Sequence, residues 1–112
     1  MPVSVLECGF DAGHAAAEGH FPGDPIIPGA VVLCEALLAL EAGGVATPAP
    51  LLVRWAKFFH PVRPGDRMRI ECSGPEAGGG PDSATGRTRI ACSVQGRPVL
   101  AAELQCGEAR IP

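Results

Sequence analysis

The fold is decided by the stretch GHFPGDPIIPG, Gly19 to Gly29, and by the apolar run 30–42 that follows it. Three prolines between residues 22 and 28 leave the first part few backbone conformations, so His20 is presented on a stiff turn. The run 30–42 contains neither glycine nor proline and is rich in Ala and Leu, which favours a helix. We predict that this helix starts at Pro28 and stops at Gly43-Gly44.

The predicted helix is apolar on nearly all sides, and such a helix belongs in the middle of a core. Burying a carboxylate at its centre, Glu35, is energetically unfavourable unless the carboxylate has an ion-pair or hydrogen-bond partner or a functional role. His20 before the helix and Glu35 within it therefore form a candidate acid/base pair, because a histidine titrates near neutral pH. Two other interpretations stay open: His20 only fixes its loop, or Glu35 only pairs with an arginine or a backbone amide.

Short strands are predicted around this helix. Segments 68–73 and 87–94 alternate polar and less polar residues, which is typical of half-buried strands, and Gln95-Gly96-Arg97 turns the second into a hairpin. Further strands are expected at 2–8, 51–59 and 98–105. One strand, one buried helix and four antiparallel strands indicate an α+β fold, in which a curved antiparallel sheet wraps the helix. At 112 residues we expect a single domain, 1–112.

Composition and charge argue against several classes of protein. The formal net charge of −3 is unlike that of a nucleic-acid-binding domain, which is normally basic. The apolar run is shorter than the roughly 20 residues that a membrane span requires, and Met1 to Gly9 lacks the pattern of a signal peptide. We therefore expect a cytoplasmic protein that binds neither nucleic acid nor membrane.

The charges are also unevenly distributed. Residues 1–53 contain six acidic and no basic side chains, whereas residues 54–112 contain all nine Lys and Arg and six acidic side chains. A basic cluster of this kind can attract an acidic partner, or its members are simply the solvated outer faces of strands. The cluster includes Arg54, Lys57, Arg63, Arg67 and Arg69.

The five cysteines are widely spaced and form no C-x-x-C pair, so we interpret them as reduced, buried, small apolar residues. No spacing typical of a metal site links Cys8, His14, His20 and His60. We expect neither a metal nor another cofactor. Cys34 as a nucleophile facing His20 is an alternative, although a cysteine inside an apolar helix is usually inert.

Residues His20 to Gly29 resemble, without a gap, the motif H-F-P-G-x-P-x-x-P-G of the hotdog-fold beta-hydroxyacyl-acyl-carrier-protein dehydratases. Seven fixed residue types at fixed spacing seldom occur together by chance. A second stretch, Lys57 to Asp66, resembles the K-F-x-x-P-V-x-P-G-D strand and turn of the same family.

The resemblance implies the hotdog fold and a dehydratase that acts on 3-hydroxyacyl thioesters of acyl carrier protein or coenzyme A, in fatty-acid, lipid or polyketide synthesis. It also implies a homodimer, or a larger assembly of dimers, in which the histidine of one subunit faces the acid of the other across an acyl tunnel. His20 would be the base and Glu35 the acid. The N–H groups of Gly29 and Ala30 would stabilise the enolate-like oxygen. Further substrate contacts are expected from Phe21, Pro28, Val31 and Cys34, with Ile26 and Ile27 also able to line the tunnel.

This chain departs from the family at the acid. The family acid follows the histidine by fourteen residues, a position occupied here by Cys34, and Glu35 comes one residue later. Successive helix residues point about 100° apart, so the two side chains leave the helix in different directions. A catalytically silent hotdog subunit, which binds acyl carrier protein or completes a heterodimer, is therefore an alternative. A hotdog acyl thioesterase is a third interpretation, although such enzymes do not usually carry the first motif.

Overall fold

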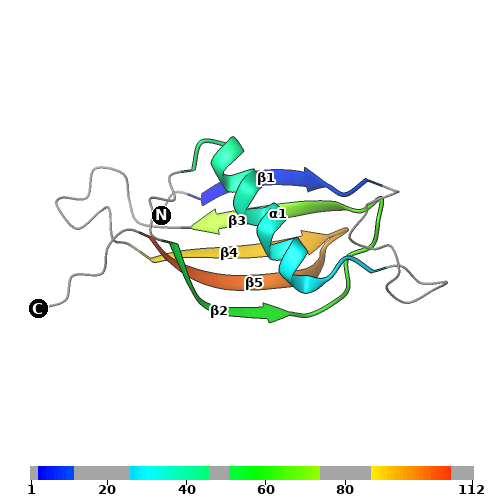
Figure 1. Ribbon diagram of the computed structural model, residues 1–112. Coiled ribbons are helices and arrows are strands. Elements are labelled where there is room, and N and C mark those ends of the chain that lie inside the picture. The colour runs from blue at the N-terminus through cyan, green and yellow to red at the C-terminus, as the bar shows by residue number, and fades with distance from the viewer. Residues whose placement is uncertain (1–2, 12–25, 46–50, 74–86, 107–112) are drawn as a thin grey trace, which may run out of the picture.

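The computed structural model describes residues 3–11, 26–45, 51–73 and 87–106, which form one helix and five strands (Figure 1). The helix α1 spans Gly29–Ala42. The strands join in one antiparallel sheet in the order β1-β3-β4-β5-β2, and α1 lies across one face of it. The strands are β1 Val3–Gly9, β2 Leu51–Phe58, β3 Arg67–Ser73, β4 Arg87–Val94 and β5 Arg97–Cys106.

The two faces of the sheet differ in the way that the alternation predicts. Along β3, Met68, Ile70 and Cys72 are buried on the inner face, toward α1, and Arg67, Arg69 and Glu71 are exposed on the outer face. Strand β4 repeats this pattern, because its partners in the register fall on the same side. The inner face thus supplies most of the core, while charged side chains gather on the outer face.

The helix contacts the sheet through one row of side chains. Val32, Ala36 and Leu40 are buried and recur about once per helical turn, so they fall on one side of α1. The opposite stripe is uncovered, since Cys34 is exposed and Leu38 keeps 58% of its surface accessible. The sequence predicts an apolar helix in the middle of a core, but in the described part of the chain only one side of α1 is covered. The expectation that the cysteines are buried is wrong for Cys34.

The ends of α1 agree with the sequence prediction. Pro28 caps the helix, and its carbonyl accepts hydrogen bonds from the N–H groups of Val31 (2.9 Å) and Val32 (3.1 Å). At the other end, a Cβ on Gly43 would lie only 2.5 Å from Leu6 Cδ2 on β1. A side chain at this position would displace the end of the Leu6 side chain, so the helix ends in close contact with β1.

The predicted strands are confirmed within one or two residues at each end. The hairpin between β4 and β5 turns at Gln95 and Gly96, which both have positive φ (51° and 78°), as a type I′ hairpin turn requires. The loops expected within 12–25, 46–50 and 74–86 lie outside the described residues. Among the described residues, no helix combines the length and the apolar character needed to cross a membrane.

Candidate active site

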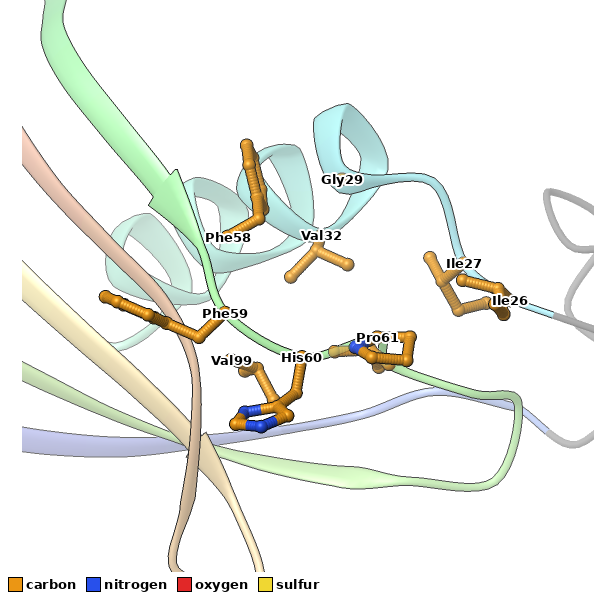
Figure 2. Close-up of a pocket in the computed structure, with 10 residues that line it drawn as sticks. Ile26, Ile27, Gly29, Val32, Phe58, Phe59, His60, Pro61 and Val99 are labelled. Atoms are coloured by element: carbon orange, nitrogen blue, oxygen red, sulfur yellow. The ribbon is translucent and has the colours of Figure 1, made fainter.

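A pocket of about 280 Å³ opens beside the first turn of α1, where the two sequence motifs meet (Figure 2). One wall comes from the segment that leads into the helix and from the helix itself. The other wall comes from the end of β2 and the turn after it, with one residue of β5. The lining residues are Ile26, Ile27, Gly29, Val32, Phe58, Phe59, His60, Pro61, Val62 and Val99.

Backbone hydrogen bonds hold these walls together. Ile27 N–H donates to the Val62 carbonyl at 2.7 Å and forms an isolated bridge between the two motifs. Phe59 N–H donates to the Val99 carbonyl at 3.0 Å, which fixes the end of β2 to β5. Ile27 and Val62 are both only 2% exposed, so the bridge is anchored in the core. These backbone hydrogen bonds therefore fix the distance between the two walls of the pocket.

Phe58 packs its ring against the start of the helix. A Cβ on Gly29 would lie 3.0 Å from Phe58 Cε1 and 3.1 Å from Cδ1, so glycine is what allows the ring to approach the backbone so closely. Figure 2 shows Phe58 directed toward α1 and Phe59 directed away from it. The pocket is consequently apolar on the side where the helix begins.

The helix N-terminus supplies the polar component of the site. Within the part of the chain that the structure describes, the N–H groups of Gly29 and Ala30 meet no hydrogen-bond acceptor. These donors lie at the positive end of the helix dipole. An anionic oxygen that approaches them would gain both hydrogen bonds and a favourable field. Of the two, Gly29 lines the pocket and Ala30 is exposed.

Cys34 and Glu35 leave the helix in different directions, as their positions in the sequence require. Cys34 is a free thiol on the uncovered stripe. Glu35 is half-buried, and its negative charge acts on Cys8 of β1. The pKa of the Cys8 thiol is raised, first by burial and then by this charge. The carboxylate of Glu35 therefore lies on the β1 side of the helix.

The buried thiols between sheet and helix are poor nucleophiles. Burial, with smaller contributions from Cys8 and Cys72, raises the pKa of Cys92 to about 12. A thiol with such a pKa stays protonated at neutral pH, and the thiolate is the reactive form. Cys92 thus behaves as the buried, inert apolar residue that the sequence predicts; Cys72 is also buried, whereas Cys8 is only half-buried.

His60 is fixed by the start of β5. Its Nδ1 lies 2.8 Å from the Pro98 carbonyl oxygen, and since a carbonyl only accepts, Nδ1 must carry the proton. In Figure 2 the imidazole extends away from Gly29 and Val32, on the far side of the β2 end. His60 is thus a residue just beyond the end of β2, held to β5 by its imidazole.

The other predicted site residues are distributed as follows. Ile26 and Ile27 line the pocket, Pro28 caps the helix beside it, and Val31 is half-buried against the core. His20 and Phe21 lie outside the described residues. Sequence reasoning did not assign Phe58 and Phe59 to the pocket, although the K-F-x-x-P-V motif that contains them is the signal that points to it. The described residues contain no group of three or more His, Cys, Asp or Glu side chains arranged to hold a metal ion.

Comparison with known proteins places the chain among dehydratases. Residues 3–81 match the family described as ApeI-like, ApeI dehydratase. A 3-hydroxyacyl-[acyl-carrier-protein] dehydratase FabZ from Klebsiella pneumoniae subsp. pneumoniae is 32% identical over 104 residues, which cover 83% of this chain and 65% of that protein. The corresponding FabZ of Sodalis glossinidius is 38% identical over 63 residues, covering 48% of this chain and 42% of that protein. The chain thus spans less than two thirds of the length of these relatives.

Solved structures share the fold at low sequence identity. The dehydratase heterocomplex ApeI:P from Xenorhabdus doucetiae matches with a TM-score of 0.64 and 14% identity, over 94% of this chain and 88% of that chain. A 1,4-dihydroxy-2-naphthoyl-CoA thioesterase from Synechocystis matches with a TM-score of 0.62 and 16% identity, over 99% of this chain and 90% of that chain. These likenesses confirm the hotdog fold that the motifs predicted.

Proposed function

The chain belongs to the ApeI-like dehydratase family, and from this premise we propose that it acts as a dehydratase of 3-hydroxyacyl thioesters borne by acyl carrier protein or coenzyme A. Fatty-acid, lipid or polyketide synthesis in the cytoplasm is the proposed setting. The observation that carries the proposal is the meeting of the two motif segments around the pocket at the start of α1, fixed by the Ile27–Val62 bridge.

The proposed reaction divides among three groups of the chain. His20 removes the alpha proton of the acyl group, and the electron pair moves into an enolate-like thioester. The N–H groups of Gly29 and Ala30 stabilise the negative oxygen. The bond from the beta carbon to its hydroxyl then breaks, and the proton with which the hydroxyl leaves as water comes from Glu35 of the second subunit in the proposed dimer, because within one chain Glu35 lies on the β1 side of α1 and does not line the pocket. The apolar wall of Ile27, Val32 and Phe58 supports this reading, because it suits an acyl chain.

The test is the reverse reaction, in which hydration of a 2-enoyl thioester is followed by the loss of its ultraviolet absorbance. We expect turnover by the wild-type chain and none by His20→Ala. Glu35→Gln should lower the rate about 100-fold or more, the usual contribution of a general acid. Glu41→Gln removes an exposed carboxylate at the far end of the same helix and should leave the rate unchanged. Turnover no greater than that of His20→Ala would reject the proposal.

A second candidate function is a catalytically silent subunit, and the direction of Cys34 favours it. Cys34, at the family acid position, is a thiol on the exposed stripe of α1, while the carboxylate of Glu35 lies on the side of the helix that faces β1. Such a subunit would bind acyl carrier protein without turnover and gain activity when an active hotdog partner is added. Cys34→Asp discriminates between the candidates: a large gain in rate favours the silent subunit, whereas a loss of rate in Glu35→Gln alone favours the dehydratase. Release of free thiol from a saturated acyl thioester would instead indicate a thioesterase.

Both candidates include a dimer or a larger assembly of dimers. Strand β2 is an edge of the sheet and carries exposed apolar side chains, among them Leu52 (56% exposed) and Phe58 (51% exposed). An apolar edge strand of eight residues is a template for pairing with another chain. The uncovered stripe of α1, with Leu38, adds to this apolar surface. Sedimentation of the purified chain should show a dimer, and Leu52→Lys should weaken it.

A further inference from the structure

Asp66 closes the turn between β2 and β3 with two hydrogen bonds. The turn runs Arg63-Pro64-Gly65-Asp66, and Gly65 has a φ of 94°. Proline followed by a residue with positive φ is the pattern of a type II turn. The Asp66 N–H donates to the Arg63 carbonyl at 3.1 Å, and the Asp66 Oδ2 accepts from the Arg63 N–H at 2.9 Å. The carboxylate thus adds a second closure to a turn that the backbone already closes once.

Two segments that are distant in the sequence are attached to this turn. Just after β1, the Phe10 N–H donates to the Asp66 carbonyl at 2.9 Å, and the Phe10 carbonyl accepts from the Gly65 N–H at 2.7 Å. Just before α1, the Ile27 N–H donates to the Val62 carbonyl at 2.7 Å. Phe10 and Ile27 are only 3% and 2% exposed, so both attachments are shielded from water. Five consecutive residues, 62–66, therefore hold both segments.

These attachments fix the two ends of the segment 11–26, which carries His20. The segment begins directly after Phe10 and ends directly before Ile27. Because both neighbours are hydrogen-bonded to residues 62–66, the geometry of the turn sets the separation between the two ends. The proposed base is thus carried by a length of chain that starts and finishes at one turn.

The same turn also locates the first amide of α1. Only Pro28 separates Ile27 from Gly29, and the ring of Pro28 restricts its φ, which is −56°. A shift of Ile27 is therefore passed on to Gly29, which lines the pocket and supplies a proposed donor to the enolate-like oxygen. A misplacement of about 1 Å in such a group can cost on the order of 100-fold in rate. The geometry of the turn should consequently matter to the chemical step.

We propose that Asp66 is a positioning residue for the dehydration: by closing the turn it holds Ile27, and through Ile27 the Gly29 N–H, together with both ends of the segment that carries His20. This inference rests on the proposed function, which gives Gly29 and His20 their roles. Asp66 is half-buried and is not one of the described residues that line the pocket, so it acts through these backbone contacts and not on the substrate.

The kinetic test uses hydration of a 2-enoyl thioester and separates kcat from KM. Asp66→Ala should lower kcat about tenfold or more while KM changes less than about threefold, because the apolar wall that suits the acyl chain is retained. Asp66→Asn keeps a side-chain oxygen that can accept from the Arg63 N–H and should recover most of the rate. Glu41→Ala removes an exposed carboxylate at the far end of α1 and should change neither constant.

A second variant opens the same turn and leaves Asp66 in place. Gly65→Ala puts a side chain on a residue at φ 94°, where the added Cβ has nothing within 4 Å, so only the backbone is strained. It should lower kcat as Asp66→Ala does. The matched control is Gly44→Ala at the C-terminal end of α1, where φ is 82° and the Cβ again has nothing within 4 Å. Equal losses of kcat in the two glycine variants would overturn the inference, because general destabilisation would explain both.

Amide hydrogen exchange tests the attachments directly and needs no substrate. In Asp66→Ala the N–H groups of Phe10 and Ile27 should exchange about tenfold faster, whereas the amides of the central strand β4 should be unchanged. Unchanged exchange at both residues, or faster exchange with no loss of kcat, would overturn the inference while the proposed function stands. Absence of turnover in the wild-type chain would reject the proposed function and this inference together, so the two failures are distinguishable.

Discussion

Glu103 is a buried carboxylate whose removal should cost measurable stability. It is only 6% exposed, and its two oxygens face Arg89 Nε at 3.1 Å and Arg54 Nε at 3.4 Å. Glu103→Gln keeps the shape, but its amide presents N–H donors to a guanidinium that itself only donates. Charge-assisted hydrogen bonds are worth about 1.5–3 kcal/mol each, but both arginines remain partly in water. The side chains of Arg54 and Arg89 are 37% and 69% exposed, so we discount the loss to about 1–2 kcal/mol.

The assay is urea unfolding of the wild type and two variants, followed by tryptophan fluorescence, because Trp55 is the only tryptophan of the chain and lies opposite Glu103 in the register. The matched control is Glu71→Gln. Glu71 also pairs with an arginine, at 3.2 Å, but its side chain is 51% exposed, so the loss should stay below about 0.5 kcal/mol. Equal free energies of unfolding for the two variants would refute the reasoning that burial makes the Glu103 contacts valuable.

Three further outcomes are expected. Leu40→Ala should lower the free energy of unfolding by about 2–5 kcal/mol, because Leu40 is 0% exposed between helix and sheet; a loss below about 1 kcal/mol in chemical denaturation would contradict this packing. A thiol reagent should label the exposed Cys34 in the native protein, as peptide mass mapping would show, and should reach the buried Cys72 only on unfolding. Burial raises the pKa of Cys92 from its ordinary 9.0 to about 12, so the stability that the neutral thiol contributes is complete below about pH 9 and is lost as the pH rises toward 12. The free energy of unfolding of Cys92→Ala should therefore fall less steeply at alkaline pH than that of the wild type. Parallel pH profiles of the two proteins would contradict this prediction.

The sequence predicts the elements of this fold better than their arrangement. Alternation identifies β3 and β4 because one face of each strand is buried and the other carries charge. The limits of α1 follow from Pro28 and Gly43, which act through local backbone geometry. The pairing of β1 with β3 depends on contacts between distant segments, and no local pattern encodes it. Strand β2 lacks alternation, since it is an edge strand with a register shift between Val53 and Trp55.

The candidate site was predictable only where a motif marks it. The segment from Ile26 to Gly29 was expected to bound an acyl site, and it lines the pocket. Val99 reaches the same pocket from β5, where no sequence signal sets it apart. The burial of Glu103 is equally invisible in the sequence, because it arises from cross-strand neighbours. A shift at Val53/Trp55 brings Arg54 to one of its oxygens, and the β4 register brings Arg89 to the other.

The Ile27–Val62 bridge joins parts of the chain that are 35 residues apart, and this has a practical consequence. A small molecule lodged beside the bridge contacts the helix, β2 and β5 at once, so it binds only when all three are assembled. Mass action then raises the melting temperature with ligand concentration. Screening fatty acids of graded length by thermal shift would therefore report which tail the cavity accommodates, even for a chain that turns over nothing.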